Sequence, residues 1–80
     1  MSGAEGKVLL AVRLTGREVQ VLRLIAHGCT YAQAAAQLGM SAHTVGTHMK
    51  SAYRKLDVHS AAAAVMRVME LGLFQSAETQ

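Results

Sequence analysis

The polar residues between positions 42 and 56 have the types and the spacing of a surface that binds an acidic polymer. When the segment is drawn as a helix, hydroxyl and cationic side chains fall on one side, and no aspartate or glutamate occurs in it. Such side chains bind phosphate oxygens and the edges of bases. The expected DNA contacts are His43, Thr44, Thr47, Lys50, Ser51, Arg54 and Lys55. A cluster of this kind is also compatible with a solvated surface, and for His43 both interpretations stay open.

A second place for an anion precedes residues 31–38. The first turn of a helix leaves backbone amides unpaired and carries a partial positive charge, which favours a phosphate oxygen. Thr30 and Tyr31 lie at such a start. We therefore expect both of them to contact DNA as well.

Other kinds of site have little support in the sequence. The histidines and the single cysteine lack the Cys-x2-Cys or His-x3-His spacing that is typical of zinc sites. Cys29 is expected to pack as a small hydrophobic residue, His59 to lie in a loop, and His48 either to pack beside the core or to contact DNA. Paired carboxylates, a phosphate-binding glycine loop and a nucleophile beside a base are all missing from the pattern. We expect no metal, no cofactor and no enzymatic activity.

The spacing of capping residues and glycines predicts four helices and no strand. Thr15 precedes Glu18 by three residues, the spacing of a capping box, in which each side chain accepts from the other residue's backbone amide. Thr30 and Gln33 repeat this spacing, and a serine caps each of the other two helices. The predicted helices cover residues 16–27, 31–38, 42–56 and 61–71.

The short connection between the second and third predicted helices is typical of a helix-turn-helix. About three residues separate them. In that motif the second helix of the pair lies in the major groove of DNA. The other side of this helix is apolar at Val45, Met49, Ala52 and Leu56, which recur at helical spacing and are expected to face the core.

The fourth predicted helix has two apolar stripes. The first contains Ala64, Val65, Val68 and Leu71 and is expected to join the core. The second is expected to meet a second copy of the chain, because an exposed apolar strip on so small a domain favours association. This predicted dimer interface consists of Ala62, Met66, Met69 and Leu73. The alternative is that both stripes pack inside one copy.

Length and composition set limits on everything else. The chain has 80 residues, a formal net charge of +3 and a single cysteine, so it forms one small domain without an internal disulfide. Its longest apolar runs, residues 8–12 and 61–66, are far shorter than the ~20 residues of a membrane span. The start of the chain does not have the pattern of a secretion signal. We expect a cytoplasmic protein without a membrane partner.

The motifs together resemble the LuxR-type (GerE-like) helix-turn-helix domain over residues 14–74. The matching pattern reads Leu14-Thr15-x-Arg17-Glu18, Val21-Leu22-x-Leu24-x-Ala26-x-Gly28, Leu38-Gly39-x-Ser41-x-x-Thr44-Val45-x-x-His48, Lys55-Leu56-x-Val58 and Gly72-Leu73. The resemblance implies an all-α, four-helix domain that binds promoter DNA as a homodimer. It places the third helix in the major groove and the fourth in the dimer contact. Residues 1–13 would then be a short extra N-terminal segment, helical or extended, and residues 75–80 a flexible tail.

The resemblance also gives individual positions a meaning. Thr47 and Lys50 match positions that face bases, and Lys55 matches a lysine near the DNA backbone. Gly46 stands where the family usually has a lysine or arginine, which either lets the backbone approach DNA closely or weakens recognition. Ala61 replaces an arginine at the start of the fourth helix. Because these changes remove cations, the alternative function is a protein-interaction module that pairs with another regulator or with RNA polymerase and binds DNA weakly.

Overall fold

The computed structural model describes residues 13–72, which form four helices and no strand. In chain order these are α2 (Gly16–Ala26), α3 (Tyr31–Leu38), α4 (Ala42–Leu56) and α5 (Ala61–Glu70). Every helix starts at its predicted residue and ends within one residue of the predicted end, so the all-α class is confirmed. Most of the predicted N-terminal segment, the predicted tail and Leu73 of the predicted dimer interface lie outside the described residues.

Each helix begins at a side chain that accepts from a backbone amide in the first turn. Both predicted capping boxes form: the amide of Glu18 donates to Thr15 Oγ1 at 3.1 Å, and the amide of Thr15 donates to Glu18 Oε1 at 2.8 Å. Thr30 and Gln33 exchange the same two bonds at 3.1 and 2.8 Å. Serine hydroxyls cap the starts of α4 and α5. The caps at Thr30 and Ser41 fix where α3 and α4 begin, and the second of them sets the end of the turn between these two helices.

The helices end in two different ways. Gly39 closes α3 with φ of +69°, a left-handed conformation that glycine adopts without a steric penalty. Asp57 closes α4 with φ of +58°, and no other described residue apart from glycine has a positive φ. An aspartate tolerates this conformation better than most residues because its short polar side chain forms local hydrogen bonds. The sequence analysis predicted the last residue of α4 but not the left-handed conformation of Asp57.

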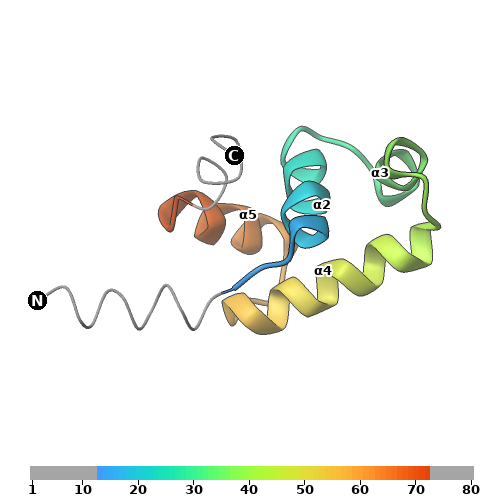
Figure 1. Ribbon diagram of the computed structural model, residues 1–80. Coiled ribbons are helices and arrows are strands. Elements are labelled where there is room, and N and C mark those ends of the chain that lie inside the picture. Colours follow the sequence, from blue (N-terminus) through green and yellow to red (C-terminus); the bar gives the residue numbers. More distant parts are fainter. Residues whose placement is uncertain (1–12, 73–80) are drawn as a thin grey trace, which may run out of the picture.

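Helices α2 and α4 organise the packing. Each of them contacts the other three helices. In Figure 1, α2 stands between α3 and α5, and α4 runs across all of them. The long helix therefore has one side against the rest of the domain and leaves its opposite side outward.

The core lies where α4 crosses the other helices. Its α4 members recur at the predicted helical spacing, and its α3 members are alanines, which let two helices approach closely. The buried apolar residues are Val21, Leu22, Ala34, Ala35, Val45, Met49, Ala52, Leu56, Ala64 and Val68. None of the helices between residues 13 and 72 is long and apolar enough to cross a membrane.

Candidate nucleic-acid interface

The outward side of α4 carries the polar residues that the sequence analysis grouped together. Thr47, Lys50 and Arg54 are exposed on successive turns, and His43 is exposed one turn before them. They are outward because Val45, Met49, Ala52 and Leu56 turn the other side of the helix into the core. No acidic residue occurs in α4 itself. The result is a row of hydroxyl and cationic groups open to a large ligand.

The two threonine hydroxyls of this side are held by local hydrogen bonds. Thr44 Oγ1 accepts from the hydroxyl of Ser41 at 2.9 Å, which leaves the Thr44 proton to donate elsewhere. Thr47 Oγ1 donates to the carbonyl of His43 at 3.1 Å, which leaves its lone pairs to accept. The Thr44 hydroxyl can therefore donate to a phosphate oxygen, and the Thr47 hydroxyl can accept from the amino group of a base.

Lys55 is placed differently from the other predicted contacts. Its Nζ lies 2.9 Å from Glu18 Oε1, and its side chain is only one-third exposed. The two residues join the first turn of α2 to the last turn of α4. Lys55 therefore has an ion-pair partner inside the domain, where the sequence analysis expected a contact to DNA.

The carboxylate of Glu18 is buried and yet well satisfied. The same oxygen accepts from the Thr15 amide at 2.8 Å and from Lys55 at 2.9 Å. Burial raises the pKa of Glu18, but hydrogen bonds from Thr15, Lys55 and Ser51, together with the charge of Lys55, outweigh it and lower the pKa below its usual value. Glu18 is therefore an ionised anchor for one flank of α4. Ser51, also a predicted DNA contact, is half-buried on this flank.

The opposite flank of α4 is covered by Tyr31 from the first turn of α3. A Cβ at position 46 would lie 3.7 and 3.9 Å from Cε2 and Cδ2 of the Tyr31 ring, so the ring lies directly over Gly46. The ring remains 38% exposed. The place that a side chain at position 46 would use is thus taken by an aromatic ring from the neighbouring helix.

Tyr53 holds the far end of that ring. Burial, followed by the interactions with the Tyr31 side chain, raises the pKa of Tyr53 to about 12. The Tyr53 and Tyr31 side chains therefore interact, which links α4 to α3 across the helix-turn-helix.

The start of α3 keeps two amides for an external acceptor. The capping box uses the amides of Thr30 and Gln33. Among the described residues, the amides of Tyr31 and Ala32 have no hydrogen-bond partner. This places the predicted anion position at the same corner of the domain as the Tyr31 ring.

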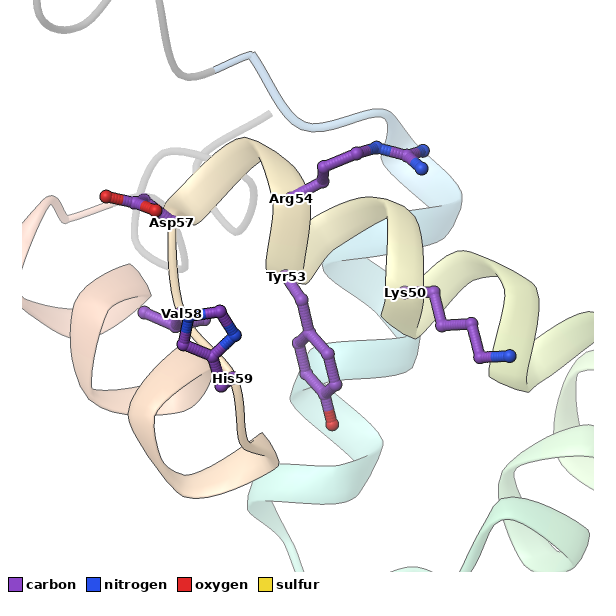
Figure 2. A pocket seen from close by; sticks show the side chains of 6 residues that line it. All are labelled: Lys50, Tyr53, Arg54, Asp57, Val58 and His59. Carbon is purple, nitrogen blue, oxygen red and sulfur yellow. The ribbon is translucent and has the colours of Figure 1, made fainter.

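An open groove of about 330 Å³ follows the second half of α4 into the next segment. Its lining residues are Lys50, Tyr53, Arg54, Asp57, Val58 and His59. Figure 2 shows the Tyr53 ring projecting from α4 between Lys50 and His59. The segment folds back because the amide of Val58 donates to the carbonyl of Tyr53 at 3.0 Å.

Sequence reasoning missed three groups at this site. It did not place Tyr53, on the flank of α4, or Asp57 and the loop residue His59, which follow the helix, at a ligand-binding surface. Asp57 and His59 line the groove from the segment after α4, where Asp57 takes the left-handed conformation. The spacing of α4 could have placed Tyr53 one turn from Lys50, but no pattern predicts its partner on another helix.

The outer side of α5 is apolar. Met66 and Met69 are 61% and 65% exposed, and Ala62 is exposed beside them. Ala64 and Val68 of the first predicted stripe are buried in the core. The two stripes therefore lie on different sides of α5 within the described residues.

The remaining histidines and the cysteine form no cluster. His48 is half-buried, and Cys29 is half-buried with its Sγ accepting from Gln37 Nε2 at 3.6 Å. Between residues 13 and 72, no group of three or more histidine, cysteine, aspartate or glutamate side chains is arranged to hold a metal ion. The polar side of α4 is the feature of this part of the chain that points to a ligand.

Comparison with protein families identifies this arrangement. Residues 12–68 match the family described as bacterial regulatory proteins, luxR family. The chain belongs to the luxR family. This LuxR-family domain has the helix-turn-helix of the family in α3 and α4, and DNA-binding transcription regulation is the activity of that class of protein.

Several curated relatives are longer regulators. The domain is 41% identical over 63 residues to the transcriptional activator protein CarR of Pectobacterium carotovorum, which covers 79% of this chain and 26% of CarR. It is 49% identical over 57 residues to a nitrate/nitrite response regulator protein homolog of Haemophilus influenzae, covering 71% of this chain and 27% of the relative. The chain thus spans about a quarter of the length of these relatives. No solved structure matches it.

Proposed function

We propose that this LuxR-family domain binds promoter DNA sequence-specifically as a homodimer, with α4 in the major groove, and so acts as a transcription regulator in the cytoplasm or as the effector domain of one. The observation that carries the proposal is the exposed, acid-free side of α4. It is supported by the contacts that hold both flanks of the helix, the ion pair of Lys55 with Glu18 and the packing of the Tyr31 ring over Gly46. A helix fixed in this way presents its side chains without having to be ordered by the ligand.

Within this proposal the residues divide into two kinds of contact. Thr47 and Lys50 point outward near the middle of α4 and are assigned to base edges. Arg54 at the end of α4 and the amides at the start of α3 are assigned to phosphates. His43, Thr44 and Ser51 complete the expected contact surface, and Lys55 supports it through Glu18.

In this proposal, the second copy of the chain pairs with the first through the outer side of α5. Met66 and Met69 are the two most exposed large apolar side chains among the described residues, and they lie on one side of the helix. Pairing through a two-fold axis would bury them and place two copies of α4 on half-sites about one helical turn of DNA apart. Leu73 is expected to extend this surface.

The test is selection of bound duplexes from a random pool, followed by fluorescence anisotropy with the selected duplex in a salt series. If about six to ten phosphates are neutralised per dimer, affinity should fall by roughly 10³ to 10⁵ between 50 and 200 mM salt. Enrichment of an inverted repeat is the expected outcome of the selection. A pool without enrichment, together with a shallow salt dependence, would contradict the proposal.

That negative outcome would favour the alternative, a protein-interaction module. The observation in its favour is the loss of cations at Gly46 and Ala61 beside an exposed apolar side of α5. In that case the partner would be another regulator or RNA polymerase.

A further inference from the structure

The open groove beyond the second half of α4 is lined mainly by groups that suit an anion. Its side chains with a hydrogen-bond donor are Lys50, Tyr53, Arg54 and His59. Small-molecule sites are mostly apolar and bury their ligand, whereas this groove is open and polar. Figure 2 shows Lys50 and His59 on opposite sides of the Tyr53 ring, so the donors are spread along the groove. This arrangement suits a chain of phosphates better than a single small ion.

The segment between α4 and α5 holds His59 between two anchors. Before it, Val58 packs against the core, and the Val58 amide donates to the carbonyl of Tyr53 at 3.0 Å. After it, the hydroxyl of Ser60 accepts from the amide of Ala63 at 3.1 Å and caps α5. His59 itself is exposed, and within residues 13–72 its ring nitrogens have no hydrogen-bond partner. An imidazole has a donor nitrogen in either charge state, so His59 is available to a phosphate oxygen.

Asp57 lines the same groove, at a place where an acid is unfavourable for two local reasons. Its φ of +58° is more typical of glycine or asparagine at the end of a helix. The C-terminal end of a helix also carries a partial negative charge, which disfavours a carboxylate. Asp57 is exposed and forms no ion pair with another described residue. Its charge therefore opposes the phosphates that the neighbouring donors attract.

From this geometry we infer that the groove binds the sugar-phosphate backbone of a DNA strand, with His59 donating to a phosphate and Asp57 limiting the affinity. The inference rests on the proposed function, because Lys50 and Arg54 of the proposed contact surface also line the groove. It extends that surface beyond α4 into the segment before α5. Neither His59 nor Asp57 is among the DNA contacts expected from the sequence.

The first experiment compares His59→Ala and His59→Lys on the selected duplex by fluorescence anisotropy. His59→Ala is expected to weaken binding about tenfold, since a hydrogen bond to a charged acceptor is lost. His59→Lys should bind at least as tightly as the unmodified protein and show a steeper salt dependence, because an ammonium also neutralises a phosphate. Circular dichroism melts show whether each variant is folded at the assay temperature. A loss caused only by altered structure would not be rescued by lysine.

A second measurement locates the contact on the DNA. It uses duplexes in which one phosphate at a time is replaced by a neutral methylphosphonate. At one linkage per half-site, this change should weaken binding of the unmodified protein about tenfold and that of His59→Ala much less. Equal sensitivity of the two proteins at every linkage would contradict the contact.

Asp57→Asn tests the limit on affinity without disturbing the end of α4, because asparagine also tolerates the left-handed conformation. Affinity is expected to rise about fivefold at about 50 mM salt and by less at about 200 mM, where the repulsion is screened. Glu70→Gln is the matched control. It removes the same charge from an exposed position at the end of α5, outside the groove, and should change affinity by less than about twofold.

The outcomes separate this inference from the proposed function. His59→Ala binding like the unmodified protein would overturn the contact. Asp57→Asn binding like the unmodified protein, or no more tightly than Glu70→Gln, would overturn the role of Asp57. In these cases the proposed function would stand. If the unmodified protein binds no duplex, the proposed function and this inference fall together.

Discussion

Glu18 shows how a single side chain can serve two elements. Its Oε1 accepts hydrogen bonds from the Thr15 amide at the start of α2 and from the Lys55 ammonium near the end of α4. A buried carboxylate is tolerated here because it accepts a backbone hydrogen bond and pairs with a lysine of opposite charge. Gln33 accepts the same capping hydrogen bond at the start of α3 without a charge. A glutamine can therefore make the cap, whereas the ion pair needs the carboxylate.

Glu18→Gln should therefore keep the cap and lose the ion pair. We expect the free energy of unfolding at neutral pH to fall by about 1–3 kcal/mol, because Lys55 loses a partner of opposite charge. A urea titration measures this, and Lys55→Met in a double-mutant cycle should show that the two effects are not additive.

The pH dependence of that difference follows from the lowered pKa of Glu18. A carboxylate whose pKa is lower in the folded state stabilises the protein above its unfolded pKa of about 4.3, and this contribution is lost as the pH falls through the folded pKa. The difference in stability between the unmodified protein and Glu18→Gln should thus narrow in acid. A constant difference between pH 7 and pH 3 would contradict the role assigned to the ion pair.

Lys50 and Arg54 should differ in what their loss does to recognition. Lys50→Ala is expected to weaken binding about tenfold and to relax the base preference at one position of each half-site. Arg54→Ala should weaken binding to all sequences alike and reduce the slope of the salt dependence. Repeating the duplex selection with each variant tests the pair, and an unchanged base preference for Lys50→Ala would remove it from the base contacts.

At the scale of elements, local signals could be predicted and contacts between helices could not. The capping boxes and Gly39 act within a few residues, so the sequence predicts helix bounds to within one residue. The apolar spacing of α4 likewise predicts which side faces outward. The ion pair of Lys55 was not predicted because its partner, Glu18, is 37 residues away in the chain. The Tyr31 ring over Gly46 was missed for the same reason, since only the packing of α3 on α4 brings them together.

Gly46→Ala is the corresponding prediction for helix α4. The added Cβ lies at an ordinary contact distance from the Tyr31 ring, and alanine favours a helix more than glycine does. We expect a gain of up to about 1 kcal/mol, which raises the Tm by several degrees in a domain of this size. A lowered Tm would contradict the conclusion that the Tyr31 ring accommodates the added Cβ at an ordinary contact distance.

At the scale of the whole molecule, two sides of the described domain expose different kinds of side chain, and we expect them to bind different partners. The outward side of α4 is polar and free of acids, whereas the outer side of α5 has two exposed methionines. In Figure 1 these two helices adjoin one another, so a second copy on α5 would set the spacing of the two α4 helices. Dimer formation and DNA binding are therefore expected to depend on each other.

Met66→Asp and Met69→Asp should each give monomers in sedimentation experiments and weaken binding to a two-half-site duplex by at least tenfold. A buried charge without a partner opposes association. Ala36→Asp, which places the same charge on the exposed side of α3, is the matched control and should leave the mass unchanged. An unaltered sedimentation coefficient in both methionine variants would rule out this interface.

The pairing of Tyr31 with Tyr53 also gives the domain an internal optical reporter. The chain has two tyrosines and no tryptophan, and both tyrosines lie where α3 meets α4. Its intrinsic fluorescence consequently arises from that joint alone, without a label. A melt followed by emission and one followed by helix content would coincide if the recognition unit opens together with the rest of the domain, and would separate if it opens first.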